Sequence, residues 1–199
     1  MSEKKSKRTT SLEEKVLVIS EGKEIYVPRS EAVTKGLTRV IVAGVITDDG
    51  HRIFLQCRKK KGDPHDGWYT TSFAGHVSEA DKDVPGWDRY ISAAMREQEE
   101  ELGISVALRY CVFKDFEGLQ NKFYYEGQWS SSNGILHPNG EECDRRKSHF
   151  YDVSRIADMM AFVNADGRPL YNFTPGIVFY LKNRMPEIFG DIEGLSLSE

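Results

Sequence analysis

The sequence predicts a single α+β domain over residues 15–199. Segments of high strand propensity lie before and after one strongly charged helical segment, and no internal repeat divides the chain. The chain has 199 residues, of which 39% are hydrophobic and 29% are charged, with a formal net charge of -4. This composition is typical of one globular domain with a sizeable core.

The N-terminal part is expected to begin with a disordered tail at residues 1–14, because these residues are mostly polar and basic. Two short strands are predicted next, at Lys15–Ser20 and Glu24–Val27, on either side of Glu21-Gly22. Together they predict an N-terminal β-hairpin extension over about residues 15–35.

The remaining strands are predicted at six segments rich in β-branched or aromatic residues, namely Leu37–Thr47, Arg52–Arg58, Trp68–Val77, Ser105–Phe116, Lys122–Ser130 and Phe150–Val153. Gly, Pro, Asn and Ser are frequent in Ser131–Glu142, which is expected to be a loop. Helices are predicted at Asp88–Leu102, at Val153–Phe162 and at about residues 174–186, with Pro175 in the first turn of the last one.

Composition also limits the cellular setting. No stretch approaches 18 apolar residues, and the N-terminus lacks the apolar segment of an export signal, so we expect a cytoplasmic protein without membrane contact. The three cysteines, Cys57, Cys111 and Cys143, are widely spaced and odd in number, which favours reduced thiols over a disulfide framework or a zinc site. The mildly acidic balance argues against a stable nucleic-acid partner.

Three carboxylates on the predicted central helix are the strongest chemical signal. Glu97, Glu100 and Glu101 share about one third of the helix circumference, where each like-charged neighbour pair costs about 0.2 to 0.5 kcal/mol. A solvated charged face is the simpler interpretation of an acidic run, but a bound cation would cancel the repulsion. Because only oxygen ligands are available, the sequence predicts Mg²⁺, with Mn²⁺ as a substitute, and therefore a phosphate-containing substrate.

The rest of this helix is patterned for packing. Ile91, Met95, Gln98 and Leu102 form the adjoining stripe that would dock the helix, and the small Ala93 leaves room beside the carboxylates. Gly103 then follows as a helix stop, because glycine tolerates the left-handed conformation after the last turn. The pattern predicts a helix with one packed side and one acidic side.

The segment Arg96 to Ile104, REQEEELGI, resembles the second half of the Nudix box, G-x5-E-x7-R-E-U-x-E-E-x-G-U, where U is an apolar residue. Gln98 departs from the pattern by replacing an apolar residue. The box glycine is best matched by Gly75, seven residues too early, so the loop carries an insertion. Counting back from Arg96 gives Asp88 at the first box carboxylate, with Glu79 as a rival.

The resemblance covers roughly Leu37 to Leu181 and implies a mixed sheet between helices. It further implies that Glu97, Glu100, Glu101 and the main-chain carbonyl of Gly75 are metal ligands, and that Arg96 orients the carboxylates. The implied reaction is cleavage of a diphosphate linkage by metal-activated water, as in a Nudix-type pyrophosphohydrolase. Candidates for the general base are Glu97, Glu141 and Glu142.

A basic run precedes the acidic helix. Arg58, Lys60 and Lys61 follow a predicted strand and are candidates for binding the diphosphate, because arginine matches phosphate oxygens and lysine supplies positive charge. The alternative is an ordinary basic surface run. His76, next to Gly75, is expected to shape the loop rather than to carry protons.

Two other functions remain open. The segment from Leu55 to Val77, with Pro28-Arg29, is similar to the Nudix branch that includes isopentenyl-diphosphate isomerase, but Ser72–His76 lacks the cysteine that this chemistry requires, so hydrolysis is favoured. A non-catalytic nucleotide-binding module is the second alternative, against which the three retained glutamates argue. The expected partner is a small-molecule diphosphate such as a nucleoside diphosphate derivative. The N-terminal hairpin could also form a homodimer, although no sequence feature supports this.

Overall fold

The computed structural model describes residues 13–83, 88–116 and 120–190. The predicted tail therefore falls almost entirely outside the described residues. The strands are β1 Lys15–Ser20, β2 Lys23–Pro28, β3 Thr38–Thr47, β4 Ile53–Cys57, β5 Tyr69–Thr70, β6 Phe73–His76, β7 Leu108–Phe116, β8 Gln120–Gln128 and β9 His149–Tyr151. The helices are α1 Arg29–Thr34, α2 Arg89–Leu102, α3 Val153–Ala161, α4 Pro175–Arg184 and α5 Pro186–Phe189, with short 3-10 helices at η1 Glu79–Asp83 and η2 Ser131–Asn133.

The strands form a mixed sheet around β3, as the sequence predicts. β3 runs parallel to β8 from Arg39↔Gln120 to Thr47↔Gln128, and antiparallel to β1, β4 and β6. β7 extends the sheet beyond β8, while β5 and β9 pair with β4. Because β3 is buried on both faces over most of its length, its sequence is a nearly continuous apolar run.

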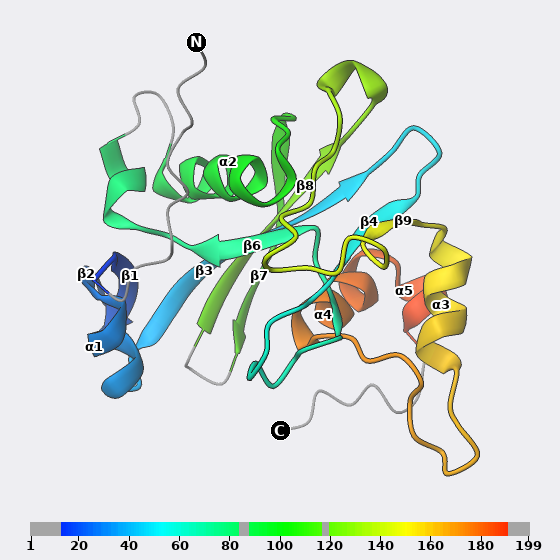
Figure 1. Cartoon of the computed structure of the whole chain (residues 1–199). Helices are drawn as coiled ribbons and strands as arrows, with labels where there is room; N and C mark the ends of the chain where they lie inside the picture. Colours follow the sequence, from blue (N-terminus) through cyan, green and yellow to red (C-terminus); the bar gives the residue numbers. More distant parts are fainter. Residues whose placement is uncertain (1–12, 84–87, 117–119, 191–199) are drawn as a thin grey trace.

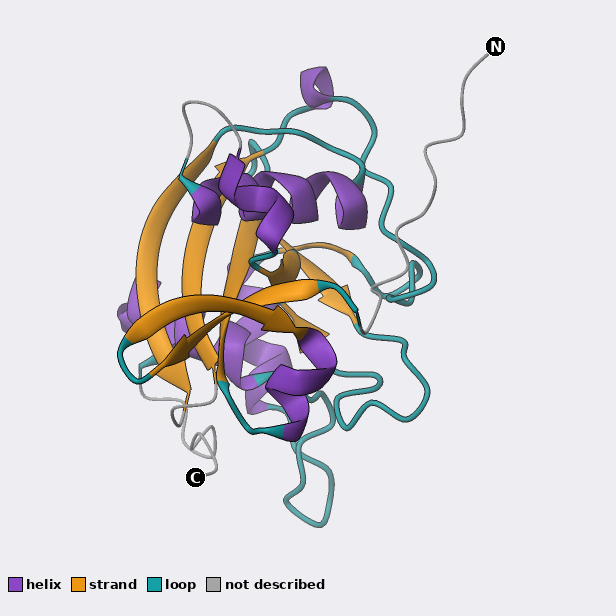
Figure 2. Ribbon diagram, turned by 90° about the vertical axis from the view of Figure 1, so that its left-hand side faces the viewer, coloured by secondary structure: helices purple, strands orange, loops and turns teal. Residues whose placement is uncertain are grey.

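Helices cover both faces of this sheet (Figure 1, Figure 2). On one face α2 packs Ala93, Ala94 and Leu102 against a core that contains Phe73. On the other face, α3, α4 and α5 contribute to a second core around Tyr124 of β8, with members Ile156, Met159, Ile177, Leu181 and Phe189. The predicted α+β class is confirmed, with buried cores between the sheet and the helices. None of the described helices is long and apolar enough to cross a membrane.

The N-terminal hairpin is also confirmed. β1 and β2 pair in continuous register from Lys15↔Pro28 to Ser20↔Lys23. The turn residues Glu21 and Gly22 both have positive φ, at 51° and 73°, which suits a tight two-residue connection. The short helix α1 directly after β2 was not anticipated from the sequence.

One predicted strand is divided in two. The sequence predicts a single strand over Trp68–Val77, whereas the structure has β5 paired with β4 and β6 paired with β3. Ser72 lies at the crossover, where its buried hydroxyl donates to the carbonyl of Phe54 at 2.6 Å and accepts from the N–H of Ile46 at 2.8 Å. The Ser72 side chain thus fixes the point where the chain leaves β4 and begins to pair with β3. This change of partner is why β5 and β6 are separate strands.

Candidate active site

The acidic helix α2 is fixed at both ends by its own sequence. Asp88 caps its N-terminus by accepting from the N–H groups of Tyr90 and Ile91, at 2.8 and 2.9 Å. Gly103 ends it in the left-handed conformation, with φ 67°. Of the predicted docking stripe, Gln98 and Leu102 are fully buried, while Ile91 and Met95 are partly buried. The helix therefore has the predicted packed side and a carboxylate side.

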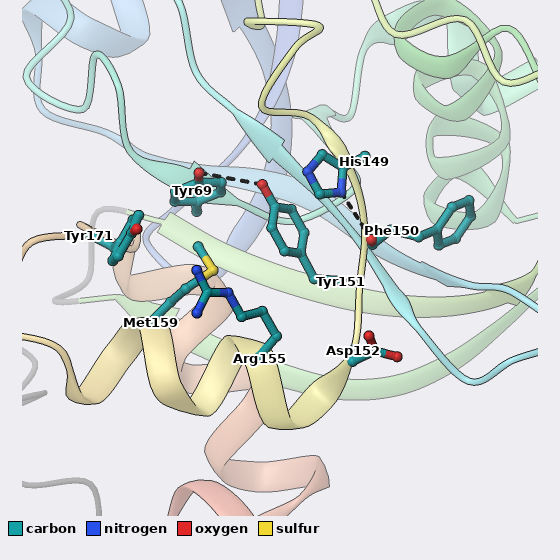
Figure 3. Close-up of a pocket in the computed structure, with 8 residues that line it drawn as sticks. All are labelled: Tyr69, His149, Phe150, Tyr151, Asp152, Arg155, Met159 and Tyr171. Atoms are coloured by element: carbon teal, nitrogen blue, oxygen red, sulfur yellow. Dashed lines mark hydrogen bonds between the residues drawn. The ribbon is translucent and has the colours of Figure 1, made fainter.

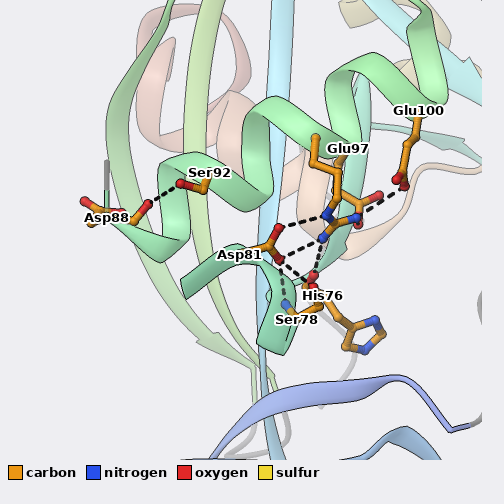
Figure 4. Close-up of polar contacts among 8 residues, drawn as sticks. His76, Ser78, Asp81, Asp88, Ser92, Glu97 and Glu100 are labelled. Atoms are coloured by element: carbon orange, nitrogen blue, oxygen red, sulfur yellow. Dashed lines mark hydrogen bonds and ion pairs between the residues drawn. The ribbon is translucent and has the colours of Figure 1, made fainter. Parts of the chain in front are cut away.

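Arg96 connects the carboxylates of the site (Figure 4). Its Nη1 donates to Glu97 Oε1 at 2.6 Å and to Glu100 Oε2 at 3.2 Å, and its Nη2 donates to the carbonyl of His76 at 2.9 Å. A bidentate pair with Asp81 completes the set, at 2.8 and 3.0 Å. The hydrogen bond to Asp81 and the charge of Glu97 raise the pKa of Arg96, although burial opposes the rise. Arg96 is therefore a permanent cation that orients two of the predicted ligands.

Asp81 is a site residue that the sequence prediction missed. It is buried, with 4% of its side chain exposed, and it also accepts from the N–H and the hydroxyl of Ser78. The two residues considered for this role have other contacts: Asp88 caps α2, and Glu79 pairs with Lys15 at 3.2 Å. Counting forward from Gly75 would have found Asp81, because five residues separate the two, as in the box pattern. The insertion therefore follows the first carboxylate instead of preceding it.

Gly75 and Glu97 fit together closely. A Cβ added to Gly75 would lie 1.9 Å from the carboxyl carbon of Glu97, so only glycine leaves space for this carboxylate against β6. Two of the predicted metal ligands, Gly75 and Glu97, thus lie next to each other in the structure.

Two glutamates of α2 have strongly perturbed acidity. Burial raises the pKa of Glu97 to about 7, against the opposing charge of Arg96. Burial and the neighbouring Glu97 and Glu142 raise the pKa of Glu101 well above its usual range, although Glu101 accepts from the N–H of Ala74 and from the Gln56 amide. Carboxyl groups of this kind bind a proton at neutral pH unless a cation replaces it.

Gln56 was also missed by the sequence prediction. It is a buried polar residue of β4 whose Nε2 donates to Glu101 Oε2 at 2.9 Å and to the carbonyl of Ser72 at 2.6 Å. Its only sequence signal is a polar residue inside an otherwise apolar strand. Gln56 therefore helps to fix the position of the Glu101 carboxyl group.

Glu142 reaches the site from a distant loop. The loop is attached to the end of α2 by hydrogen bonds from the N–H of His137 to the carbonyl of Leu102 and from the N–H of Asn139 to the carbonyl of Glu101, both at 2.8 Å. The exposed Glu142 is close enough to raise the pKa of Glu101 by its charge. Glu141, the other candidate in this loop, is exposed as well.

The basic candidates lie after β4. Arg58 forms an ion pair with Asp63 at 2.5 Å, and its main chain bridges to Cys143, next to Glu142. Lys60 and Lys61 are exposed in the loop that follows. Of the three, Arg58 is the residue that the fold holds in a defined position beside the Glu142 loop.

The acidic groups fit a hard cation by their chemistry. Within the described residues no three His, Cys, Asp or Glu side chains are grouped closely enough to hold a metal ion. Glu97 and Glu100 instead both point at Arg96. The donor set of carboxylates beside the main chain of β6 is nevertheless the kind that Mg²⁺ prefers. The raised pKa values of Glu97 and Glu101 reflect their burial beside other acidic groups.

A separate aromatic pocket lies between β9 and α3 (Figure 3). Its volume is about 370 Å³, and it is lined by Tyr69, His149, Phe150, Tyr151, Asp152, Arg155, Met159 and Tyr171. The imidazole of His149 stacks on Tyr151 with ring centroids 3.9 Å apart. None of the predicted site residues lines this pocket, so the candidate active site is the carboxylate cluster of α2.

Comparisons with known proteins show the family to which the chain belongs. The family model for the NUDIX domain matches residues 37–171, which is more than half of the chain. None of the curated proteins matches. Among solved structures, the chain is similar to DR0079 from Deinococcus radiodurans, with a TM-score of 0.56 and 14% identity over 74% of this chain and 89% of that one. It is also similar to MutT studied from Aliivibrio salmonicida and Vibrio cholerae, with a TM-score of 0.50 and 19% identity over 77% and 98%. At these identities the likeness shows the fold, whereas the family match shows membership. This chain belongs to the NUDIX domain family.

Proposed function

We propose that the protein is a Mg²⁺-dependent pyrophosphohydrolase that cleaves a diphosphate linkage in a nucleoside diphosphate derivative or a related organic pyrophosphate. The observation that carries the proposal is the pair of carboxyls, Glu97 and Glu101, whose pKa values are raised beside the main chain of β6. Burying two acids next to each other is unfavourable, and a divalent cation would remove the cost by replacing the shared protons.

The residues of the chain have separate tasks in this reaction. Arg96 holds Glu97 and Glu100 in place, and Asp81 holds Arg96 through two parallel hydrogen bonds. Gln56 fixes the position of Glu101. When bound, Mg²⁺ supplies charge neutralisation for the diphosphate and a more acidic water molecule. These contacts orient the ligands before the substrate arrives, which lowers the cost of assembling the site.

Proton transfer and phosphate binding draw on neighbouring groups. Glu97 and Glu142 are our candidates for the general base, and Glu142 is the exposed one, beside Glu101. Arg58 is our candidate for contact with the diphosphate, with Lys60 and Lys61 adding positive charge from the adjoining loop.

The three thiols argue against the isomerase alternative. Cys57 donates to the carbonyl of Gly67 at 3.4 Å, and Cys111 donates to the carbonyl of Tyr124 at 3.1 Å. Burial raises the pKa of Cys57, of Cys111 and of Cys143. Thiols of this kind are poor acids and nucleophiles, and none of them lies in Ser72–His76.

A panel assay tests the proposal. Nucleotide and prenyl diphosphates would be incubated in Mg²⁺ buffer, and phosphate release would be measured with and without a coupled phosphatase. We expect Glu101→Gln to reduce turnover by about 100-fold or more, because the change keeps the shape of the side chain and removes a ligand charge. Glu99→Gln is the matched control, since Glu99 is an exposed residue of the same helix outside the proposed ligand set.

Two outcomes would contradict the proposal. Turnover by Glu101→Gln at the wild-type rate would remove the site assignment. No metal-dependent release from any substrate would favour the isomerase or the binding module, which an isopentenyl diphosphate assay would then separate.

A further inference from the structure

The aromatic pocket between β9 and α3 lies on the sheet face opposite the carboxylate cluster (Figure 3). His149 of β9, which lines the pocket, pairs with Leu55 of β4, and Leu55 belongs to the core to which α3 contributes. Gln56, the next residue of β4, points to the other face, where its amide contacts Glu101. The sheet therefore separates the pocket from the carboxylates of α2.

The walls of the pocket are aromatic rings that pack on one another. The ring of Tyr69 stacks on Phe173 with centroids 5.4 Å apart, and Tyr151 and Tyr171 approach the ring of Tyr69 at 5.7 and 6.3 Å. His149 stacks on Tyr151 with the ring planes 22° apart. The pocket volume of about 370 Å³ lies within the range of small-molecule sites, about 300–1,000 Å³. Walls of this kind suit a planar aromatic ring.

The hydroxyl of Tyr69 is a donor without an acceptor at normal distance. Tyr69 is only 7% exposed, and its hydroxyl oxygen lies 3.4 Å from that of Tyr151, beyond the usual length of an O–H···O bond. The hydroxyl of Tyr151 has a single hydrogen, which it donates to the carbonyl of Lys147 at 2.7 Å. Among the described residues no other acceptor contacts Tyr69. A buried donor of this kind indicates a missing acceptor in the pocket.

Arg155 adds a positive charge to the same pocket. It is an exposed residue in the first turn of α3, and within the described ranges its guanidinium makes no hydrogen bond or ion pair. Figure 3 shows its side chain extending toward the tyrosine side of the pocket, whereas the carboxylate of Asp152 points away from it. An exposed arginine alone would be ordinary, but here it lies beside a buried hydroxyl that lacks an acceptor. The two groups together favour an anion.

We propose that the pocket between β9 and α3 binds a planar aromatic anion. The ring of the ligand packs against the aromatic walls, and its carboxylate or phosphate oxygens accept from Arg155 and from the hydroxyl of Tyr69. Hydrogen bonds to an anionic oxygen are roughly twice as strong as those between neutral groups, which favours an anion over a neutral ring. Such a ligand has two sources, an aromatic carboxylate or a nucleoside monophosphate. The proposal does not depend on the proposed hydrolase function.

The binding test needs neither metal nor turnover. Isothermal titration calorimetry in EDTA buffer would compare 2-naphthoate and adenosine 5′-monophosphate with two incomplete ligands, namely adenosine, which lacks the anion, and orthophosphate, which lacks the ring. We expect at least one of the aromatic anions to bind the wild type. Adenosine and orthophosphate should bind about tenfold more weakly or less, because each loses one of the two kinds of contact.

Variants of the two donors test the assignment of residues. We expect Arg155→Gln to weaken binding of the aromatic anion about tenfold or more, and Tyr69→Phe about threefold or more, because a charged donor contributes more than a neutral one. Arg168→Gln is the matched control, since Arg168 is exposed in the loop between α3 and α4. Thermal unfolding without ligand should be equal in all of these proteins, because Arg155 is exposed and Tyr69→Phe keeps the packed ring. Lower affinity at equal stability is a result that a purely structural role would not produce.

The outcomes separate the two sources and the two sites. Binding of 2-naphthoate alone assigns the pocket to aromatic carboxylates, and binding of the nucleotide alone assigns it to nucleoside monophosphates. Nucleotide binding that is lost in Glu101→Gln but kept in Arg155→Gln would place the nucleotide at α2 and overturn the proposal for it. Failure of both aromatic anions to bind, or wild-type affinity in Arg155→Gln and Tyr69→Phe, would overturn the pocket as a site. Because no turnover is measured, the pocket and the hydrolase can each fail independently.

Discussion

At the scale of single residues, Gly75 shows how a missing side chain shapes the site. Gly75 lies in β6 and pairs regularly with Val42 of β3. It is not among the glycines with positive φ, so its backbone conformation does not require glycine. What requires glycine is space, because a Cβ would lie 1.9 Å from the Glu97 carboxyl carbon. The glycine therefore serves the approach of a carboxylate to the main chain.

This argument predicts the effect of Gly75→Ala. The added methyl group must displace the Glu97 carboxylate, and a displacement of about 1 Å in a catalytic group can cost about 100-fold in rate. We expect such a loss in kcat with the fold intact, as seen by circular dichroism. Gly50→Ala is the control, because its Cβ would meet nothing closer than 3.4 Å. Equal turnover by the two variants would show that Glu97 need not occupy this position.

The helical period selected Glu97, Glu100 and Glu101, and the resemblance to the Nudix box added Arg96. In the structure Arg96 donates to Glu97 and Glu100, and Glu97 lies against Gly75. Asp81 did not follow, because the count began at Arg96 and crossed an insertion whose position is not visible in one sequence. Its burial and its pairing with Arg96 become evident only in three dimensions.

At the scale of elements, a buried polar residue joins α2 to the segment that leads into β7. Gln98 is fully buried where the family pattern has an apolar residue. Its side chain accepts from the N–H of Val106 at 2.5 Å and donates to the carbonyl of Val106 at 3.3 Å. The amide thus satisfies the main chain of the segment between α2 and β7, where no strand partner does so.

We therefore expect Gln98→Leu to destabilise the protein even though it restores the family pattern. The leucine would leave the Val106 N–H and carbonyl unpaired in the core, at a cost of about 1–3 kcal/mol in the free energy of unfolding. Urea unfolding would measure the change, with Glu99→Gln as the exposed control on the same helix. A Gln98→Leu protein that is as stable as the wild type would show that the buried amide makes no net contribution.

Elements were predictable where a local pattern determines them. The range Asp88–Leu102 matches α2 because the cap, the apolar stripe and Gly103 all lie within it. The segment Trp68–Val77 was wrongly predicted as one strand, because the crossover at Ser72 depends on contacts with Ile46 and Phe54. Local propensity contains no information about such partners.

At the scale of the whole molecule, the site depends on contacts between distant segments. Gln56 and Glu101 are 45 residues apart, and the Glu142 loop reaches back to the end of α2. His76 of β6 and Lys122 of β8 likewise become neighbours only because both strands pair with β3 at Ile41. Sequence patterns could suggest which residue types matter, but only the strand order shows which of them meet.

Glu97 links the site to the stability of the whole molecule. Burial raises its pKa from 4.5 to about 7, with Arg96 opposing the shift and Glu100 and Asp81 adding to it. Between these values the folded chain binds a proton more tightly than the unfolded chain does. The stability contributed by this proton is fully present below a pH of about 4.5 and is lost as the pH rises through 7.

We expect the metal-free wild type to lose thermal stability from about pH 5 to about pH 8 relative to Glu97→Gln, whose neutral amide cannot titrate. Mg²⁺ should restore more stability at the higher pH, because it binds the ionised carboxylate and has no proton to displace there. Thermal unfolding in EDTA and in Mg²⁺ would measure both effects, with Glu99→Gln as the exposed control on the same helix. Parallel pH curves for the wild type and Glu97→Gln would mean that the Glu97 carboxyl is ionised in the folded protein without metal, and that Arg96 alone neutralises it.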